Sequence, residues 1–489
     1  MSQQTRRDFL KMIGLGAGSL IIPGCNIRRS AAGQSSGKPA GDKPNIILCM
    51  TDDQGWGDTG YNGHPHLKTP NLDAMVASGI RFERFYSAAP VCSPTRGSCL
   101  TGRHPYRYGI FFANAGHMRK EEVTLAEVLK TQGYTTGHFG KWHLGALTTT
   151  IKDSNRGGKP GSLEHYSPPW ENGFDVCFST EAKVPTWDPM VTPSKSAGDL
   201  GKQKSGKPFG TYYWNGPGSI VKDNLEGDDS RVIMDRAIPF IRDAVKAQKP
   251  FFTVIWFHAP HLPVVAGPKY RKMYAHLSED EQHFYGCITA MDEQMGRLRQ
   301  ELRKLGVADN TILWFCSDNG PEGKTNKGRT QGTTKGLRGR KRSLFEGGVR
   351  VPGLLEWPAK IKQSRKVTIP CCTSDYFPTV MDVLGFRMQG QPEPIDGISL
   401  LPLIDVKMKS RSAPIAFESR NQISLTDNRY KIISQNGGKT YMLFDLVEDA
   451  GERNDLAQEM PQILNDMKRK LETWRDSCKE SLAGNDYKK

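Results

Sequence analysis

Three stretches of the chain are continuous apolar or aromatic runs that end abruptly in polar residues. They lie at 45–50, 250–257 and 311–316. Runs without alternation, separated by stretches of helical character, are typical of buried strands in a mostly parallel sheet. We expect the intervening helices at 124–132, 230–248 and 279–305. The pattern predicts a doubly wound α/β fold, with a large mostly parallel sheet sandwiched by helices and ligands bound beyond the carboxyl ends of its strands.

The pattern changes after residue 378. Short alternating strands follow at 412–417, 430–434 and 439–446, and an amphipathic helix at 460–474 closes the chain. This change predicts a large domain at 45–389 and a smaller α+β domain at 390–489.

Two stretches rich in Gly, Ser, Pro and Lys, 146–169 and 183–217, are expected to be surface insertions. Tyr212, Tyr213 and Trp214 stand in the second. Basic loops with aromatic side chains suit the rim of a carbohydrate cleft, although solvent-exposed loops without a binding role explain the pattern almost as well.

The N-terminus is typical of an export signal. Arg6 and Arg7 precede an apolar run at 12–22, which is too short to span a bilayer. The Arg-Arg-x-Phe-Leu-Lys motif resembles a twin-arginine signal over residues 1–25, and Ile22-Pro-Gly-Cys25 resembles a lipobox that would lipidate Cys25, although Pro23 is an unusual residue there. Residues 26–44 are expected to be a tether. We expect an exported protein, in the periplasm or attached to the outer membrane as a lipoprotein.

The chain of 489 residues carries a formal charge of +15, which predicts an acidic partner. Nucleic acid, anionic lipid and anionic polysaccharide all qualify, and export favours the polysaccharide. The sequence has no zinc-finger spacing, helix-turn-helix pattern or basic stripe with interleaved aromatic residues, so we expect no nucleic acid partner.

Pairs of hard oxygen donors follow two of the predicted strands. Asp52 and Asp53 follow the first, and Asp318 and Asn319 follow the third. Either pair alone would more often be a turn or a helix cap. Adjacent carboxylates repel unless a cation or strong donors compensate, so the two pairs together predict a divalent metal. Oxygen-only ligands favour Ca²⁺ or Mg²⁺ over zinc.

Cys92 is expected at the N-terminus of a helix. Ser93 suits the N-cap, Pro94 the first helical position, and Gly102 the stop. Free backbone N–H groups at that place favour a thiolate or an anionic ligand, and Arg96 would project toward it from the first turn. A lone cysteine is nevertheless more often a small hydrophobic residue that fills a loop.

Basic side chains come from three other segments. They are Lys141 and His143, His258 and His261, and Lys341. Each alone is more often a surface or core residue. Together with a metal and Arg96 they would form a cationic pocket for a tetrahedral anion, with histidine as a general acid.

The stretch Cys92-Ser-Pro-Thr-Arg96 is similar to the Cys-x-Pro-x-Arg signature of the type I, formylglycine-dependent sulfatases of the alkaline phosphatase superfamily. The other family motifs follow in order along most of the mature chain. The resemblance implies an alkaline phosphatase-like fold and an arylsulfatase-like hydrolase. Export and the basic loops favour a sulfated polysaccharide fragment as substrate over a steroid or lipid sulfate. It also implies a maturase that oxidises Cys92 to the aldehyde 3-oxoalanine, or formylglycine.

The resemblance assigns roles to the candidate residues. Asp52, Asp53, Asp318, Asn319 and the modified residue 92 would bind one Ca²⁺. Lys141 and His143 would contact the nucleophile and the sulfate group, and Arg96 and Lys341 would offset charge on the sulfate oxygens. His261 would contact sulfate and protonate the leaving group, and His258 is an outer candidate for substrate binding.

The implied reaction begins with the hydrated aldehyde, whose one hydroxyl attacks sulfur and whose other hydroxyl later expels sulfate. Two alternatives remain open. A phosphate or phosphonate monoester hydrolase of the same superfamily would share the metal site and the aldehyde. A non-catalytic protein that binds sulfated glycans would keep the basic pocket while residue 92 stays a thiol.

Overall fold

The computed structural model describes residues 43–153, 160–198, 200, 203–323 and 328–488. The expected signal peptide, the lipobox with Cys25 and most of the expected tether lie outside these residues. Within the described residues, no helix combines the length and apolarity needed to cross a membrane. Their nine cysteines are unpaired, buried thiols.

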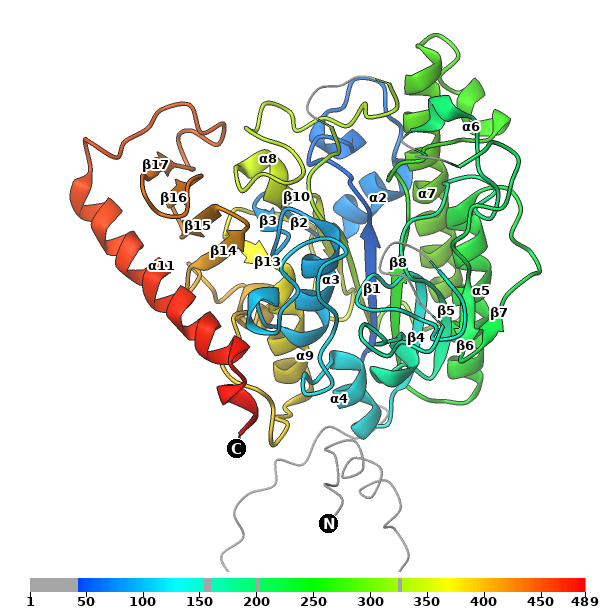
Figure 1. The fold of residues 1–489 in the computed structure, drawn as a ribbon, viewed down its shortest axis with the longest axis horizontal. Helices are drawn as coiled ribbons and strands as arrows, with labels where there is room; N and C mark the ends of the chain where they lie inside the picture. Colours follow the sequence, from blue (N-terminus) through cyan, green and yellow to red (C-terminus); the bar gives the residue numbers. More distant parts are fainter. Residues whose placement is uncertain (1–42, 154–159, 199, 201–202, 324–327, 489) are drawn as a thin grey trace, which may run out of the picture.

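A sheet of ten strands forms the centre of the molecule (Figure 1). In spatial order its strands are β12 (Arg365–Val367), β2 (Ile80–Phe82), β11 (Gly353–Glu356), β9 (Thr311–Ser317), β1 (Asn45–Thr51), β8 (Phe251–Trp256), β4 (Thr135–Lys141), β5 (Val176–Thr180), β6 (Trp214–Gly216) and β7 (Ser219–Ile220). The five strands from β9 to β5 are parallel, whereas β11 and β6 pair antiparallel at either side of them. The prediction of a mostly parallel sheet is confirmed.

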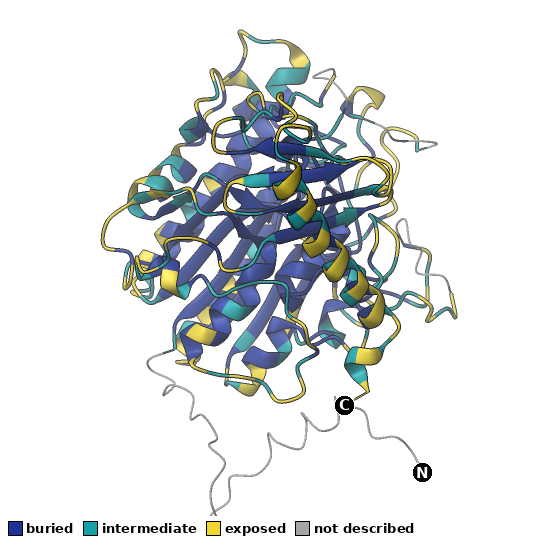
Figure 2. Cartoon of the chain, turned by 90° about the vertical axis from the view of Figure 1, so that its left-hand side faces the viewer, coloured by how far each residue is buried: buried dark blue, intermediate teal, exposed yellow. Residues whose placement is uncertain are grey.

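The sheet separates two hydrophobic cores, because successive side chains of a strand point to opposite faces. In β1, Ile46 and Leu48 join one core and Ile47 and Cys49 the other. The first core is covered by α3 (Cys92–Thr101), α4 (Leu125–Thr131) and α9 (Tyr376–Leu384), and the second by α2 (Pro70–Ser78), α5 (Asp229–Lys246) and α7 (Glu279–Lys304). Figure 2 shows the buried strands between helices whose outer faces are exposed.

The three helices and three strands predicted from sequence form within a few residues of their expected bounds. One correction concerns α3, which begins at Cys92 with Val91 as its N-cap rather than with Ser93. Pro94 therefore lies deeper in the first turn, where it is tolerated because those N–H groups have no partner within the helix. Gly102 ends the helix in the left-handed conformation, as expected.

A second, antiparallel sheet lies in the C-terminal part. Its strands are β14 (Ile415–Ser419), β15 (Gln422–Thr426), β16 (Tyr430–Ser434) and β17 (Met442–Asp445), and α11 (Pro461–Leu482) packs against it. The sequence did not predict β15 and predicted a shorter final helix. The division between domains at residue 390 stays a prediction.

The remaining elements are short. A three-stranded sheet is formed by β10 (Arg350–Val351), β3 (Phe85–Tyr86) and β13 (Cys371–Cys372). The short helices are α6 (Pro268–Lys272), α8 (Glu346–Val349) and α10 (Leu401–Ile404).

Tyr213 and Trp214 are core residues and do not line the rim of a cleft. Tyr213 stacks on Phe178 with ring centroids 4.0 Å apart, and the Trp214 indole N–H donates to Asp153 over 2.6 Å. Both aromatic side chains are buried, because the second insertion contributes a strand to the edge of the large sheet.

Candidate active site

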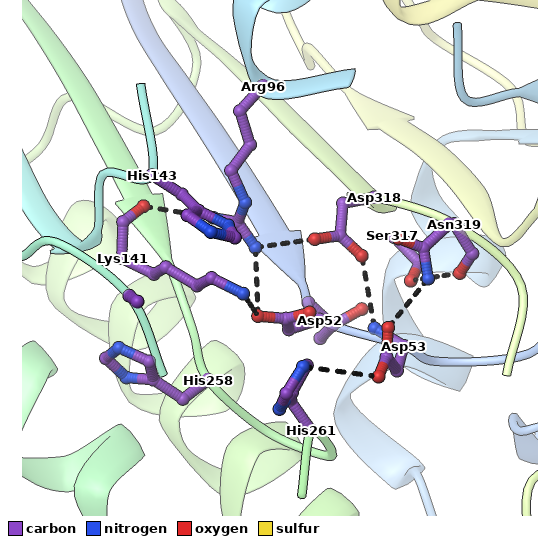
Figure 3. Close-up of polar contacts among 12 residues, drawn as sticks. Asp52, Asp53, Arg96, Lys141, His143, His258, His261, Ser317, Asp318 and Asn319 are labelled. Carbon is purple, nitrogen blue, oxygen red and sulfur yellow. Dashed lines mark hydrogen bonds and ion pairs between the residues drawn. The ribbon is translucent and has the colours of Figure 1, made fainter. Parts of the chain in front are cut away.

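The predicted polar residues converge at the carboxyl ends of the parallel strands (Figure 3). Asp52 and Asp53 follow β1, Asp318 and Asn319 follow β9, Lys141 ends β4, and His258 and His261 follow β8. Backbone hydrogen bonds between the neighbouring segments continue past the ends of the strands. The N–H of Asp52 donates to the carbonyl oxygen of Ala259, and the N–H of Asp318 donates to that of Thr51, each over 3.1 Å. The fold therefore fixes these side chains on rigid strand ends.

The acidic residues form one buried cluster. The backbone N–H of Asp53 donates to Asp318 Oδ1 over 3.1 Å, and Asn319 Nδ2 donates to Asp53 Oδ1 over 2.7 Å. One ligand atom each of Asp52, Cys92 and Asp318 lies within 4.8 Å of the others. Asp52 Oδ1 and Asn319 Oδ1 are buried without a hydrogen-bond partner among the described residues. Such oxygens are costly unless something absent from the chain binds them, and a hard cation is what this donor set accepts.

The electrostatics of the cluster also favour a cation. Burial, together with the neighbouring Asp52, raises the pKa of Asp318 to about 7. Burial likewise raises the pKa of Asp53. Asp52 differs, because Lys141 and other cationic neighbours outweigh its burial and hold its pKa well below the usual value. Full ionisation of all three carboxyl groups near neutral pH therefore requires additional positive charge.

Cys92 is a buried thiol at the first position of α3. Burial raises its pKa, although Lys141 and Lys341 oppose this effect. A thiolate is therefore not favoured, contrary to the expectation from the helix N-terminus alone. Since the thiolate is the nucleophilic form of cysteine, the unmodified side chain is poorly suited to attack.

Three cationic side chains converge on the cluster. Arg96 lies beneath it, fully buried, with Nη2 2.7 Å from Asp318 Oδ2 and 3.3 Å from Asp52 Oδ2. Lys141 Nζ is 2.5 Å from Asp52 Oδ2. Lys341 Nζ is 2.6 Å from Asp53 Oδ1. The site thus holds three cations and three carboxylates in a volume from which water is largely excluded.

His261 and His143 have different surroundings. His261 Nε2 is 3.7 Å from Asp53 Oδ2, and its Nδ1 is 2.5 Å from the carbonyl oxygen of Leu262. Burial holds the pKa of His261 well below its usual value, and nearby lysines lower it further. His143 places Nε2 2.6 Å from Asn114 Oδ1. The structure brings both histidines to the strand ends where the sequence places them.

His258 lies behind the site. Its Nδ1 is 2.8 Å from Asp229 Oδ2, its Nε2 is 2.8 Å from Thr180 Oγ1, and its side chain is completely buried. Because protein groups engage both ring nitrogens, this histidine supports the strand ends and does not offer a nitrogen to substrate.

Sequence reasoning missed two residues that hold the predicted ones. Glu322 Oε2 lies 3.3 Å from Lys341 Nζ, and Asn114 engages His143. Glu322 stands three residues after Asn319, so an acidic residue in the same strand-end loop was a usable signal. Asn114 lies in a loop without a distinguishing pattern, and only the fold brings it to His143.

Comparisons with known proteins agree along the chain. The family model described as Sulfatase matches residues 44–386, and the model described as N-sulphoglucosamine sulphohydrolase, C-terminal, matches residues 339–477. The N-acetylgalactosamine-6-sulfatase of Mus musculus is 32% identical over 405 residues, which cover 79% of this chain and 71% of that protein. Arylsulfatase A of Bos taurus is 30% identical over 469 residues, which cover 88% of this chain and 86% of that protein.

Solved structures show the same fold. The crystal structure of Ps i-CgsB in complex with k-i-k-neocarrahexaose superposes with a TM-score of 0.74 at 26% identity, covering 88% of this chain and 92% of that one. The PsFucS1 sulfatase from Pseudoalteromonas sp. has a TM-score of 0.74 at 23% identity, with coverage of 91% and 92%.

Proposed function

Because this chain belongs to the sulfatase family and is a sulfuric ester hydrolase, we propose that it removes sulfate from a sulfated carbohydrate through a formylglycine made from Cys92, with one bound Ca²⁺. The observation that carries the proposal is the position of Cys92. Its sulfur lies at a helix N-terminus, within 4.8 Å of ligand atoms of Asp52 and Asp318, in a site with three cationic side chains.

The residues present fit a calcium ion. Asp52, Asp53, Asp318 and Asn319 would hold it with oxygen atoms, of which two are buried without a protein partner. A bound Ca²⁺ supplies positive charge that polarises a sulfate oxygen and acidifies a nearby hydroxyl group. Oxygen donors without histidine or thiolate favour Ca²⁺ over transition metals.

The same position suits a modified cysteine. A hydrated aldehyde at residue 92 would supply one hydroxyl as nucleophile and a second whose deprotonation would release sulfate. Burial, which raises the pKa of the thiol, would hold the oxidised side chain in a fixed orientation at the helix N-terminus.

The side chains around residue 92 divide the remaining tasks. Lys141 and Lys341 donate hydrogen bonds to sulfate oxygens and offset the charge that develops there, while Arg96 holds Asp52 and Asp318 in place. His261 delivers the proton to the departing sugar oxygen from Nε2, because its Nδ1 is engaged by a backbone carbonyl. The positive charges of the lysines lower the pKa of His261. The negative charge of a bound sulfate ester counters this effect and raises the pKa of His261 toward the range that a general acid needs.

A substrate panel tests the proposed activity. We expect sulfate release from 4-nitrophenyl sulfate and from oligosaccharides such as N-acetylgalactosamine 6-sulfate derivatives or carrageenan hexasaccharides, after expression beside a sulfatase maturase. Much faster turnover of 4-nitrophenyl phosphate than of the sulfate would instead support the phosphate monoester hydrolase. Retention of sulfated glycans without any turnover would support the binding protein.

We further propose that the protein is exported through its twin-arginine signal and reaches the periplasm or outer membrane, with lipid attached at Cys25. The motif in residues 1–25 and the formal charge of +15, which suits an anionic polysaccharide, support this proposal. Cell fractionation tests it: replacing Arg6 and Arg7 by Lys should retain the precursor in the cytoplasm, and Cys25→Ala should prevent lipidation and release the protein from the membrane fraction.

A further inference from the structure

Arg420 stands at the turn between β14 and β15, on the side of the C-terminal sheet that faces the active-site segments. Its backbone N–H donates to Tyr106 Oη over 2.9 Å. Gln422, two residues later, donates from Nε2 to the carbonyl oxygen of Arg342 over 2.8 Å and accepts from the N–H of Leu344 over 3.0 Å. Since Arg342 directly follows Lys341, the turn is tied to the segment that carries this catalytic lysine.

The side chain of Arg420 contacts a second segment that leads into the site. Its guanidinium carbon lies 3.8 Å from the ring centroid of Phe112. Two residues later, Asn114 engages His143. The turn at Arg420, in the C-terminal sheet, therefore contacts two segments that lead into the site. One carries Lys341, and the other carries the Asn114 that engages His143.

Within the described residues, no carboxylate lies within ion-pair distance of Arg420, whose guanidinium contacts the ring of Phe112. The nearest acidic residue along its strand, Glu418, is bonded through both oxygens to Arg475 at 2.9 and 3.0 Å. Arg420 is exposed, and its φ of 55° is a conformation that costs free energy for any residue with a Cβ. Glycine would serve the turn better, so the side chain is the feature that needs a reason.

Aromatic side chains extend the surface around Arg420. Phe111 keeps 39% of its surface exposed and packs edge-on against Tyr106 with ring centroids 5.0 Å apart. The exposed phenyl ring can stack against a sugar ring. The neighbouring guanidinium, which has no carboxylate partner among the described residues, can donate two hydrogen bonds to a sulfate or carboxylate group. Neither feature contributes to the core.

We propose that Arg420, Phe111 and Phe112 form a subsite for an anionic sugar residue that neighbours the one losing its sulfate. The inference rests on the proposed function and adds to it a requirement for an oligosaccharide with a second acidic group. The subsite is separate from the buried pocket that receives the scissile sulfate, because it lies beyond Asn114 and Arg342 at the surface.

The test compares two substrates on wild-type protein and variants. Arg420→Gly removes the side chain and relaxes the positive φ, so the fold is retained. We expect it to lower kcat/KM for the best sulfated oligosaccharide of the panel about tenfold relative to kcat/KM for 4-nitrophenyl sulfate, which has no second sugar. Arg420→Lys keeps the charge and should recover part of this loss.

Arg469→Ala is the matched control, because it removes an exposed arginine from α11 in the same part of the chain. It should leave the ratio of the two substrates as in wild type. Equal loss on both substrates, no loss on the oligosaccharide, or an oligosaccharide panel that is turned over no better than 4-nitrophenyl sulfate would each overturn the subsite. Absence of turnover of 4-nitrophenyl sulfate by the wild-type protein would instead contradict the proposed function itself.

Discussion

At the scale of single residues, the site is a balance of charges that the protein alone leaves incomplete. Arg96, Lys141 and Lys341 face Asp52, Asp53 and Asp318, yet burial still raises the pKa values of Asp53 and Asp318. Two oxygens of the cluster also lack partners within the described residues. A divalent cation satisfies both requirements at once, which is why its removal should be measurable in stability as well as in activity.

Calcium should stabilise the folded protein. Saturation at a hundred times Kd adds about 3 kcal/mol to the free energy of unfolding, so chelation should lower Tm and Ca²⁺ should restore it. Asp318→Asn removes one ligand charge and should abolish the Ca²⁺-dependent rise in Tm. The control Asp309→Asn changes an exposed carboxylate and should keep the rise. An unaltered Tm on chelation of the wild-type protein would contradict the metal site.

Lys341 should matter for catalysis as well as for folding. Lys341→Ala removes a buried cation 2.6 Å from Asp53, and a lost donor of this kind typically costs about 10²-fold or more in kcat. Steady-state kinetics with 4-nitrophenyl sulfate measure the effect, and circular dichroism checks the fold. Lys335→Ala, an exposed lysine of the same segment, is the control and should retain wild-type kcat. A loss below threefold for Lys341→Ala would remove this lysine from the mechanism.

At the scale of elements, a buried ion cluster joins the C-terminal sheet to α8. Lys431 on β16 lies 2.9 Å from Glu346 at the start of α8 and 2.9 Å from Glu452, with all three side chains fully buried. Glu452 also accepts from the backbone N–H of Glu346 over 2.6 Å. Since α8 follows the segment of Lys341 within five residues, the C-terminal sheet fixes the position of that segment.

Replacing Lys431 should lower the free energy of unfolding, because it breaks the contact between the C-terminal sheet and α8. Lys431→Met leaves two buried carboxylates facing each other, and breaking a buried pair in this way costs about 3–5 kcal/mol. Urea denaturation should show the loss, while Lys439→Met, an exposed lysine of the loop between β16 and β17, should stay within about 0.5 kcal/mol of wild type. Comparable stability of the two variants would show that the junction does not depend on the charge.

Elements differ in how far the sequence predicts them. The strands β1, β8 and β9 are predictable because every residue in them is buried, which produces unbroken apolar runs. The strand β4 contains Gly137, His138 and Gly140, and has no such run. A Cβ at Gly140 would lie 2.0 Å from the carbonyl oxygen of Trp256, and its φ is 102°, so packing against β8 dictates the glycine. The short strand β11 pairs with the longer β9, and β15 pairs on both sides with strands of its own length.

The same distinction holds for the site. Strand-end pairs predict Asp52, Asp53, Asp318 and Asn319 without reference to any family, because parallel strands deliver their ends to one edge. His261 follows the end of β8 in the same way, whereas Lys341 comes from a long loop, and only the resemblance assigned it a contact with sulfate. Asn114 and Arg420 could not be placed from sequence, because tertiary packing alone brings their segments together.

At the scale of the whole molecule, the formal charge of +15 should steer a polyanionic substrate to the site. KM for a sulfated polysaccharide should rise about tenfold as sodium chloride increases from about 0.05 M to about 0.5 M, because the Debye length falls below 10 Å. KM for 4-nitrophenyl sulfate should change much less, since one charge gains little from long-range attraction. Equal salt dependence for the two substrates would argue against a polyanionic substrate.

The chemistry at residue 92 is the central claim, and the mass of the peptide that spans Cys92 tests it most directly. The protein should be expressed in a host with a sulfatase maturase, and active fractions should be digested and analysed by mass spectrometry. The account predicts the mass of an aldehyde in place of the thiol, and a hydrazone after reaction with a hydrazide. An intact thiol in protein that hydrolyses 4-nitrophenyl sulfate would contradict the formylglycine mechanism.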